Sequence, residues 1–561
     1  MTNSYKLTLR DLLLQSQELY CNKPSLSFVG EKPITYNELA NATRNISGML
    51  LSLGITKGDK IAILGENSPN WGISYFSITS IGAVAVPILT DFSEIEIDNI
   101  LEHSESKYLF VSAKMFSKIT FDRRKKLQSI ILLNTLELVD DSVIPSNSIE
   151  YKTPNIEYNP IFDSFVFPVP AEDDIAAIIY TSGTTGRSKG VMLSHKNILS
   201  NIKSTLKIQS VVSSDRLLSI LPLSHSYECT VGFLLPLYCG ASMYYIQKPP
   251  SASVLIPAMQ QVKPTLMLVV PLVIEKIYKS KILPELTSSG LKRFLFNRTL
   301  TRKVLHRIAA KKLHKTFGGK LHFFGVGGAK LSFEVEQFLF EGKFPYAIGY
   351  GMTEASPLMS GCTPKIVGFR QAGYSLPGQE MRIDSANPEN GEGEIQVRGD
   401  NVMLGYFKEP ELTKEMFTSD GWLKTGDLGV LDSKGYIELK GRSKNMILGP
   451  SGENIYPEEI EEVINNHDYV TESVVYELKG KLIAKVHLNY EAIEKKYCNL
   501  REAAINMQHE MDLRIEELKE EIRIYVNSRV SNFSKLNLVI VQVEPFEKTP
   551  TQKIKRYLYT R

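Results

Sequence analysis

Short apolar runs alternate with helical patterns through most of the chain. The run at 60–64 precedes a helical stretch that ends near Ile81, and the run at 83–86 precedes a helical pattern over 94–103 and another run at 108–111. Strands that alternate with helices form right-handed βαβ units. The pattern therefore predicts an α/β fold with largely parallel sheets covered by helices.

The pattern changes in two places before the C-terminal part. Segment 155–173 is rich in proline and acidic residues and has little periodicity, so we interpret it as the connection between two sheet-and-helix lobes. From about Leu376 onward, short alternating runs such as 392–398 and 434–440 are separated by glycine and asparagine. These runs predict a smaller β-rich lobe.

The last 120 or so residues have the pattern of a separate small α+β domain. A helix is expected over 457–466, strands over 470–476 and 482–488, and an amphipathic helix over 492–527, where apolar residues with helical spacing stand among many charges. We favour a helix packed along one face over a partner-binding element. The predicted domains are 1–440 and 441–561.

Two uncharged stretches, 71–90 and 229–247, are long enough to be considered as membrane spans. Serine, glycine and proline interrupt both, whereas a spanning helix needs about 20 predominantly apolar residues. We expect a buried helix followed by a short strand, and no membrane span. The first residues have no apolar run before their charges, so a signal peptide is not expected either.

The charge balance narrows the possible functions. Lys plus Arg is 65 and Asp plus Glu is 62, giving a formal net charge of +3 over 561 residues. A general nucleic-acid binder would have a basic excess, so no nucleic-acid partner is expected. The five cysteines are scattered without C-x-x-C spacing. This distribution favours a reducing, cytoplasmic location over a disulfide framework or a zinc site.

The most informative segment is 180–195, which follows an apolar strand at 175–179 and precedes a helical run. Glycines let the backbone approach an anion, hydroxyl groups donate hydrogen bonds, and Lys189 adds a positive charge. The loop residues are Thr181, Ser182, Gly183, Thr184, Thr185, Gly186 and Gly190. The segment predicts a phosphate-binding loop, although it is not a Walker A sequence.

This segment resembles the phosphate-binding signature of the adenylate-forming superfamily, which includes acyl-CoA synthetases, adenylation domains of peptide synthetases and beetle luciferases. Ser188 stands where the family usually has proline. Further segments resemble the family's motifs in the same order along the chain. They are Gly325-Val-Gly-Gly-Ala-Lys330, Gly349-Tyr-Gly-Met-Thr-Glu354, Gly421-Trp-Leu-Lys-Thr-Gly-Asp427, Arg442-Ser-Lys444 and the C-terminal segment 545–556.

The resemblance implies roles for individual residues. It places Thr181, Ser182, Gly183, Thr185, Gly186 and Lys189 around phosphate, Gly328 and Ala329 along the adenine, and Tyr350, Gly351, Thr353, Asp427 and Arg442 on the nucleotide. It implies Mg²⁺ on Glu354 and Thr184, and a catalytic set of Lys553, Thr184, Glu354 and His225. Lys444 falls at the family's hinge. Gln552 replaces the usual glycine before the catalytic lysine, so Lys555 is the alternative to Lys553.

The resemblance also implies an architecture and a reaction. The architecture is a large N-terminal domain of two sheet-and-helix lobes plus a β-rich lobe, and a small mobile C-terminal domain. In the reaction, ATP and a carboxylate form an acyl-adenylate and pyrophosphate, and a thiol then displaces AMP. The expected cofactors are ATP and Mg²⁺, with CoA as the acceptor.

The substrate class rests on two segments, 221–228 and 264–278, and the second is also similar to long-chain ligases although Leu272 replaces an expected arginine. Leu221-Pro-Leu-Ser-His-Ser-Tyr-Glu228 is most similar to long-chain fatty acyl-CoA ligases, and His225, Gly325, Val326 and Gly327 are the expected acyl pocket. A structural role for His225 is the alternative to a role at the substrate carboxylate. A basic helical insert over 292–315 is interpreted either as a peripheral contact with an anionic membrane or as a solvated helix face.

These observations predict a long-chain fatty acid–CoA ligase. One alternative is an acyl-carrier-protein ligase, since that acceptor presents the same thiol arm, or a ligase for another carboxylate. A catalytically silent nucleotide-binding protein is a further alternative. The acyl chain length, the oligomeric state and the pathway have no signal in the sequence.

Overall fold

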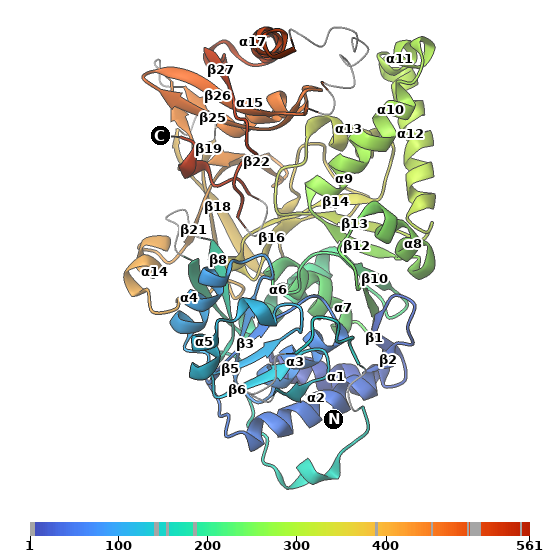
Figure 1. Ribbon diagram of the computed structural model, residues 1–561, viewed down its shortest axis with the longest axis vertical. Helices are drawn as coiled ribbons and strands as arrows, with labels where there is room; N and C mark the ends of the chain where they lie inside the picture. Colours follow the sequence, from blue (N-terminus) through green and yellow to red (C-terminus); the bar gives the residue numbers. More distant parts are fainter. Residues whose placement is uncertain are drawn as a thin grey trace. The chain divides into compact units, whose positions relative to one another are not determined.

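The computed structural model describes residues 6–139, 145–152, 156–182, 188–387, 391–449, 453–490, 493, 507–549 and 553–560 (Figure 1). The chain forms two compact units. The first consists of residues up to 382, 396–424 and 432–437, and the second of 383–395, 425–431 and 438 onward. Besides the C-terminal part expected from residue 441, the second unit thus takes in two strand segments that precede it.

One large sheet of the first unit has eight strands. Their order is β20 (Gly405–Tyr406), β9 (Ser188–Ser194), β8 (Ile175–Ser182), β4 (Val84–Ile88), β3 (Lys60–Leu64), β5 (Tyr108–Val111), β6 (Ser129–Leu132) and β7 (Glu137–Leu138). The strands from β8 to β6 in this order pair in parallel, whereas β9, β20 and β7 pair antiparallel. The phosphate-loop segment is therefore the connection of a β-hairpin at one side of this sheet.

The other large sheet has seven strands. Their order is β14 (Tyr346–Ile348), β13 (Phe323–Val326), β12 (Leu266–Val269), β10 (Arg216–Ser219), β11 (Ser242–Tyr245), β1 (Pro24–Phe28) and β2 (Ile34–Thr35). All neighbouring strands are parallel except the pair β1 and β2. All residues of β12 are apolar and buried, as is typical of a parallel strand that is covered on both faces.

Helices cover these sheets. The first unit contains α1 (Leu9–Tyr20), α2 (Tyr36–Ser52), α3 (Pro69–Ser80), α4 (Glu94–Ser104), α5 (Phe121–Lys126), α6 (His195–Ile208), α7 (Leu235–Tyr238), α8 (Ala252–Val262), α9 (Pro271–Ile277), α10 (Leu283–Leu286), α11 (Gly290–Phe296), α12 (Thr299–Thr316), α13 (Phe333–Glu341) and α14 (Pro410–Met416), with π-helical turns η3 (Glu228–Leu234) and η4 (Tyr278–Ile282). Capping residues in the local sequence determine where several of these helices begin. Thr35 and Glu38 form a capping box on α2, and Ser68 caps α3 with Pro69 in its first turn.

Smaller sheets follow the large ones. β15 (Tyr350–Gly351), β16 (Leu358–Gly361) and β17 (Tyr374–Ser375) form a three-stranded sheet, and β18 (Gln379–Asn387), β19 (Glu392–Gly399), β21 (Leu423–Leu431) and β22 (Ile437–Arg442) form a four-stranded one. The four-stranded sheet corresponds to the β-rich region expected from about Leu376, and the three-stranded sheet precedes it. The α/β prediction with two sheet-and-helix lobes and a β-rich lobe is confirmed.

The C-terminal part of the second unit is built on a small mixed sheet. The sheet contains β25 (Val470–Leu478), β26 (Lys481–Leu488) and β27 (Leu538–Val541), and β23 (Ile447–Leu448) pairs separately with β24 (Asn454–Ile455). The helices are α15 (Pro457–Asn465) and α17 (Met507–Asn527). Leu518, Ile522 and Val526 of α17 are buried in this unit's core, as a helix packed along one face requires. Apart from residue 493, the part of the predicted helix over 492–506 lies outside the described residues.

The two uncharged stretches fold as expected. Residues 71–90 form most of α3 and the buried strand β4, and residues 229–247 form most of η3, then α7 and β11. Trp71 is fully buried and stacks on Tyr75, while its edge contacts Phe233. Among the described residues, no helix is both long enough and apolar enough to cross a membrane.

Candidate active site

Several predicted site residues lie at the carboxyl edge of the seven-stranded sheet. Parallel pairing of β10, β12, β13 and β14 brings the carboxyl ends of these strands to one edge, where α/β proteins bind ligands. Gly328 and Ala329 follow β13 and are exposed there. Gly328 has a φ of +86°, a conformation that favours glycine. Tyr350 and Gly351 follow β14, and Tyr350 is buried.

The two motifs after β10 and β14 are joined directly. The Ser226 and Thr353 hydroxyls are 3.1 Å apart in a buried hydrogen bond. A Cβ on Gly351 would lie 2.1 Å from the carbonyl oxygen of Pro357, so only glycine fits this turn. His225 is half-buried, and its Nδ1 accepts a hydrogen bond from the Tyr227 N–H at 3.2 Å. The segment that contains His225 therefore lies beside the Thr-Glu motif.

Glu354 and Lys189 contact the same side chain, Tyr406. The Tyr406 hydroxyl donates to Glu354 Oε1 at 2.8 Å, and Lys189 Nζ lies 5.2 Å from the centre of the Tyr406 ring. Sequence reasoning missed Tyr406, because the contact depends on β20 pairing with β9 and has no local signal. Thr181 pairs with Lys189 across the hairpin. Gly183, Thr184, Thr185, Gly186 and the side chain of Ser182 lie outside the described part of the structure.

The chemistry of Glu354 fits a magnesium ion that is shared with phosphate. Tyr406 occupies Oε1, and no other residue in the described ranges donates a hydrogen bond to Oε2. Among the described residues, no three His, Cys, Asp or Glu side chains are grouped closely enough to hold a metal by themselves. Mg²⁺ typically binds one or two carboxylates and completes its octahedral shell with water and substrate phosphates. A single carboxylate oxygen beside the hairpin that is predicted to bind phosphate matches that donor set.

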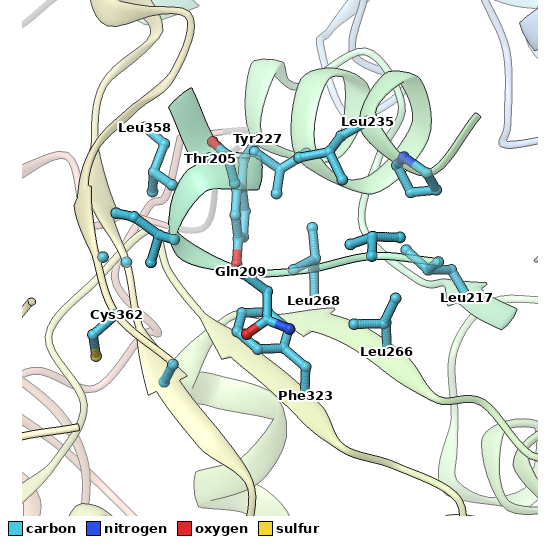
Figure 2. Close-up of a pocket in the computed structure, with 18 of the residues that line it drawn as sticks. Thr205, Gln209, Leu217, Tyr227, Leu235, Leu266, Leu268, Phe323, Leu358 and Cys362 are labelled. Atoms are coloured by element: carbon cyan, nitrogen blue, oxygen red, sulfur yellow. The ribbon is translucent and has the colours of Figure 1, made fainter. Parts of the chain in front are cut away.

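An apolar cavity of about 60 Å³ lies against one face of the seven-stranded sheet, and Figure 2 shows the side chains that converge on it. It is lined by residues from α6, η3, α7 and four strands of the seven-stranded sheet, among them Thr205, Leu217, Tyr227, Leu235, Leu266, Phe323, Gly325 and Ala347. The lining is almost entirely hydrocarbon. Burial of apolar ligand surface there contributes about 0.8 kcal/mol per methylene.

Two of the expected acyl-pocket residues lie against Tyr227. A Cβ on Gly325 would approach the Tyr227 hydroxyl to 3.2 Å, and a Cβ on Gly327 would approach its ring to 3.1 Å. Gly325 lines the cavity, whereas His225 and Gly327 are not among its lining residues. Val326 lies in the hydrophobic core, because alternate residues of β13 face opposite sides of the sheet.

Glu228 is a buried carboxyl group next to the cavity wall. It is only 2% exposed, and Ser219 donates a hydrogen bond to its Oε1 at 2.6 Å. Its Oε2 has no hydrogen-bond partner among the described residues. A Cβ on Gly232 would collide with the carboxylate at 2.7 Å, so the glycine makes room for it inside η3. Burial raises the pKa of Glu228 to about 8, although the hydrogen bond from Ser219 opposes the shift.

The second unit contains the other predicted residues. Arg442 Nε lies 2.8 Å from Asp427 Oδ1, so the pair expected at the ribose and the nucleotide is already joined by an ion pair. Asp427 is mostly buried, and the Arg442 side chain is half-exposed. Lys444 is exposed in the turn that follows, where the N–H groups of Asn445 and Met446 both donate to the Arg442 carbonyl.

Lys553 lies on a hairpin whose neighbouring residues are anchored. Arg556 Nη1 donates to both carboxylate oxygens of buried Glu461, at 2.7 and 2.8 Å, and its Nη2 donates to the Val475 carbonyl. Lys555 lies 3.8 Å from Glu547. Lys553 itself is exposed, and its backbone bonds to Thr549 in both directions. Arg556 is therefore anchored in the core of the unit, whereas Lys553, three residues before it, is exposed.

A family model for AMP-binding enzymes matches residues 13–407. The chain belongs to this family. The match covers the phosphate-loop hairpin, the Thr-Glu motif and Tyr406, all of which lie in the first unit.

Curated relatives of this AMP-binding enzyme have moderate sequence identity. Fatty acyl-CoA synthetase A of Dictyostelium discoideum is 28% identical over 565 residues, which cover 94% of this chain and 84% of that protein. Long chain acyl-CoA synthetase 6, peroxisomal, of Arabidopsis thaliana is 29% identical over 570 residues, covering 94% and 79%.

Solved structures with the same fold are more distant in sequence. ATP-bound MatB from Rhodopseudomonas palustris is 23% identical, with a TM-score of 0.75 over 99% of this chain and 98% of that one. O-succinylbenzoate Coenzyme A Synthetase (MenE) from Bacillus subtilis, solved with ATP and a magnesium ion, is 22% identical, with a TM-score of 0.74 over 97% and 98%. These likenesses establish the fold of the AMP-binding enzyme.

We predict that Glu228→Gln makes the enzyme's stability less dependent on pH. The folded protein keeps the Glu228 proton up to a pKa of about 8, whereas the unfolded chain loses it near 4.5. Unfolding therefore releases a proton between these values, and this group's contribution to stability falls as pH rises, by up to about 1.4 kcal/mol per pH unit. Glutamine cannot ionise. The Tm of the variant minus that of the wild type should grow between pH 5.5 and 7.5.

Exposed Glu94→Gln on α4 is the matched control, since it removes a carboxylate without burial. A difference for Glu228→Gln that stays constant over this pH range, or shrinks, would contradict the assignment.

Proposed function

We propose that this chain is an AMP-forming long-chain fatty acid–CoA ligase that uses ATP and Mg²⁺. The observation that carries the proposal is the double role of one strand end. Gly325 of β13 lines the apolar cavity, and Gly328 and Ala329, which follow the same strand, are the predicted adenine segment. An acyl chain in the cavity would thus present its carboxylate at the edge where the nucleotide is expected. The names of the relatives support the same substrate class.

The chemistry consists of two displacements. A carboxylate oxygen of the fatty acid attacks the α-phosphorus, the new C–O–P linkage forms, the bond to the β-phosphate oxygen breaks, and pyrophosphate leaves. The CoA thiol then gives up its proton, its sulfur attacks the acyl carbon, and AMP leaves with the electrons of the broken C–O bond. Both anions of the first step repel each other, so its barrier is largely electrostatic.

The charged residues suit that barrier. Lys189 and Lys553 would stabilise negative charge on the phosphates, and Asp427 would accept hydrogen bonds from the ribose hydroxyls. Glu354, together with Thr184, would hold the magnesium ion, which supplies Lewis-acid polarisation of the phosphate oxygens. His225 would lie near the substrate carboxylate. We propose residues 441–561 as the mobile domain and Lys444 as its hinge, since an exposed turn residue absorbs changes in φ and ψ easily.

A second acceptor has a specific observation in its favour. The long-chain-fatty-acid–[acyl-carrier-protein] ligase AEE15, chloroplastic, of Arabidopsis thaliana is 29% identical over 552 residues, which cover 83% of this chain and 74% of that protein. CoA and acyl carrier protein present the same phosphopantetheine thiol. Acyl carrier protein is therefore the alternative acceptor in the proposal.

Pyrophosphate release tests the substrate class. With ATP and Mg²⁺, fatty acids of 12–18 carbons should support release at least tenfold faster than acetate or benzoate, because an apolar cavity rewards each buried methylene. Ala347→Phe, which fills the cavity from β14, should lower kcat/KM for the longest acids most strongly. Parallel assays with CoA and with holo-acyl carrier protein identify the acceptor. Faster release with short or aromatic acids would refute the proposed substrate class.

Half-reaction assays test the catalytic lysine. Lys553→Ala should slow acyl-adenylate formation about 100- to 1,000-fold, because it removes one charged donor from the transition state. It should leave thioester formation from supplied acyl-adenylate within about threefold of wild type, because the lysine acts only in the first step. Lys555→Ala, which removes a lysine from the same hairpin, is the matched control. The opposite ranking of the two variants would assign the role to Lys555.

The exposed face of α12 supports a peripheral membrane contact, which we include in the proposal. Leu300, Val304 and Ile308 are 81%, 54% and 63% exposed and follow one another at helical spacing. Lys303, Arg307 and Lys311 form a parallel exposed basic row, and Leu291 and Phe294 of α11 extend the apolar face. Arg302 is not part of this basic row, because its guanidinium makes a two-point ion pair with Glu341. The face combines apolar insertion with attraction to anionic lipid.

Flotation with vesicles tests this contact. The enzyme should float with vesicles of phosphatidylcholine and phosphatidylglycerol and less with phosphatidylcholine alone, since each cation near an anionic surface contributes about 1 kcal/mol. L300S/V304S/I308S and K303Q/R307Q/K311Q should each reduce flotation at least fivefold. Ile95→Ser on α4, which is 74% exposed, is the control for general loss of surface hydrophobicity. Flotation that is equal in all variants would exclude this face.

A further inference from the structure

Tyr406 is a buried aromatic residue between two oppositely charged residues of the proposed ATP site. It is 3% exposed, its hydroxyl donates to Glu354 Oε1 at 2.8 Å, and its ring lies 5.2 Å from Lys189 Nζ. We propose that Tyr406 is a positioning residue that holds the Glu354 carboxylate for the metal and keeps Lys189 available for phosphate. This inference rests on the proposed function, in which Glu354 binds Mg²⁺ and Lys189 binds ATP.

The backbone fixes Tyr406 in this place from two sides. Tyr406 pairs with Val191 in β9, and the Phe407 N–H donates to the Gly190 carbonyl at 2.8 Å, next to Lys189. On the other side, the Met403 N–H donates to the Glu354 carbonyl at 2.8 Å. The 403–407 segment is thus hydrogen-bonded both to the phosphate-loop hairpin and to the backbone of Glu354, which holds the Tyr406 backbone between them.

Helix α14 supplies a further anchor. The Tyr406 N–H donates to Thr413 Oγ1 at 2.9 Å, and Gly405, with a φ of +138°, lies against the same threonine. Thr413 also donates to the Glu409 carbonyl at 2.8 Å, which ties it to the start of its own helix. These contacts orient the Tyr406 backbone without touching Glu354 or Lys189.

The tyrosine keeps the two charges from neutralising each other. Neither Lys189 nor Glu354 forms an ion pair with any described residue, although both contact the same side chain. A direct pair would engage both groups before ATP binds. The ring attracts the ammonium through its face, and the hydroxyl holds one carboxylate oxygen and leaves Oε2 for a cation.

The test separates the hydrogen bond from the ring. Tyr406→Phe keeps the aromatic face and removes only the hydroxyl, and Tyr406→Leu removes both. Tyr346→Phe is the matched control, because Tyr346 is also buried and its hydroxyl is 3.5 Å from another glutamate, Glu336. Electron paramagnetic resonance of free Mn²⁺ in the presence of ATP measures metal binding without turnover, and fluorescence titration without metal measures ATP binding alone.

The expected results differ between variants. Tyr406→Phe should weaken Mn²⁺ binding in the presence of ATP at least fivefold, raise the half-saturating Mg²⁺ concentration in pyrophosphate release in parallel, and leave metal-free ATP binding within twofold. Tyr406→Leu should also weaken metal-free ATP binding at least threefold, because Lys189 loses the ring. Tyr346→Phe should change none of these values by more than twofold. Wild-type Mn²⁺ binding in Tyr406→Phe would overturn the inference.

Two arrangements keep the test decisive. Mn²⁺ binding requires no reaction. It therefore tests the positioning role of Tyr406 even if no carboxylate supports pyrophosphate release and the proposed function fails. If circular dichroism shows that Tyr406→Phe does not fold, Thr413→Ala replaces it, since it retains the tyrosine and removes its anchor. That variant should weaken Mn²⁺ binding at least twofold, and an unchanged value would likewise overturn the inference.

Discussion

The parallel pairing of β10, β12, β13 and β14 is the constraint on which the described part of the candidate site depends. Hydrogen bonds in a parallel sheet align strand directions, so the segments that leave these strands must start from the same edge. The His225 segment, the adenine segment and the Thr-Glu motif are far apart in sequence, but each leaves one of these strands. A shift of one strand would move its glycines away from Tyr227 and close the cavity with side chains.

The buried glutamates differ in how completely their carboxylates are hydrogen-bonded. Glu461 is compensated by Arg556 and by the Val475 N–H, and Glu336 accepts hydrogen bonds from the Arg370 backbone N–H and guanidinium. Glu354 has only a neutral hydroxyl as its described side-chain partner, and Glu228 has only that of Ser219. Desolvation of a carboxylate is costly without compensation. The charge-paired glutamates therefore hold structure together, whereas Glu354 lies beside the predicted phosphate loop and Glu228 next to the cavity wall.

The sequence predicts the fold better than it predicts the contacts within the site. Alternation of apolar runs and helical patterns follows from local periodicity, so α3, β4 and the two large sheets could be expected from it. The predicted phosphate loop stands out because glycines, hydroxyl residues and a lysine are unusual in that combination, whereas the Thr-Glu motif is recognised only by its place in an ordered set of family motifs. Tyr406 could not, because its role arises from antiparallel pairing of β20 with a strand more than two hundred residues earlier. Val326 was expected in the pocket with its two neighbouring glycines, but strand alternation turns it into the core.

The segment that carries Lys553 combines an arginine anchored by an ion pair with a lysine that is exposed to solvent. A lysine that must meet phosphate needs a long, hydrated side chain, and such a side chain loses its charge readily when it is buried. Arginine retains its charge in a partly buried ion pair, and its several N–H donors can bind a carboxylate and a carbonyl together. The chain accordingly places Arg556 on buried Glu461 and leaves Lys553 exposed. The buried pair anchors the backbone three residues after Lys553, the lysine that we propose to act on phosphate.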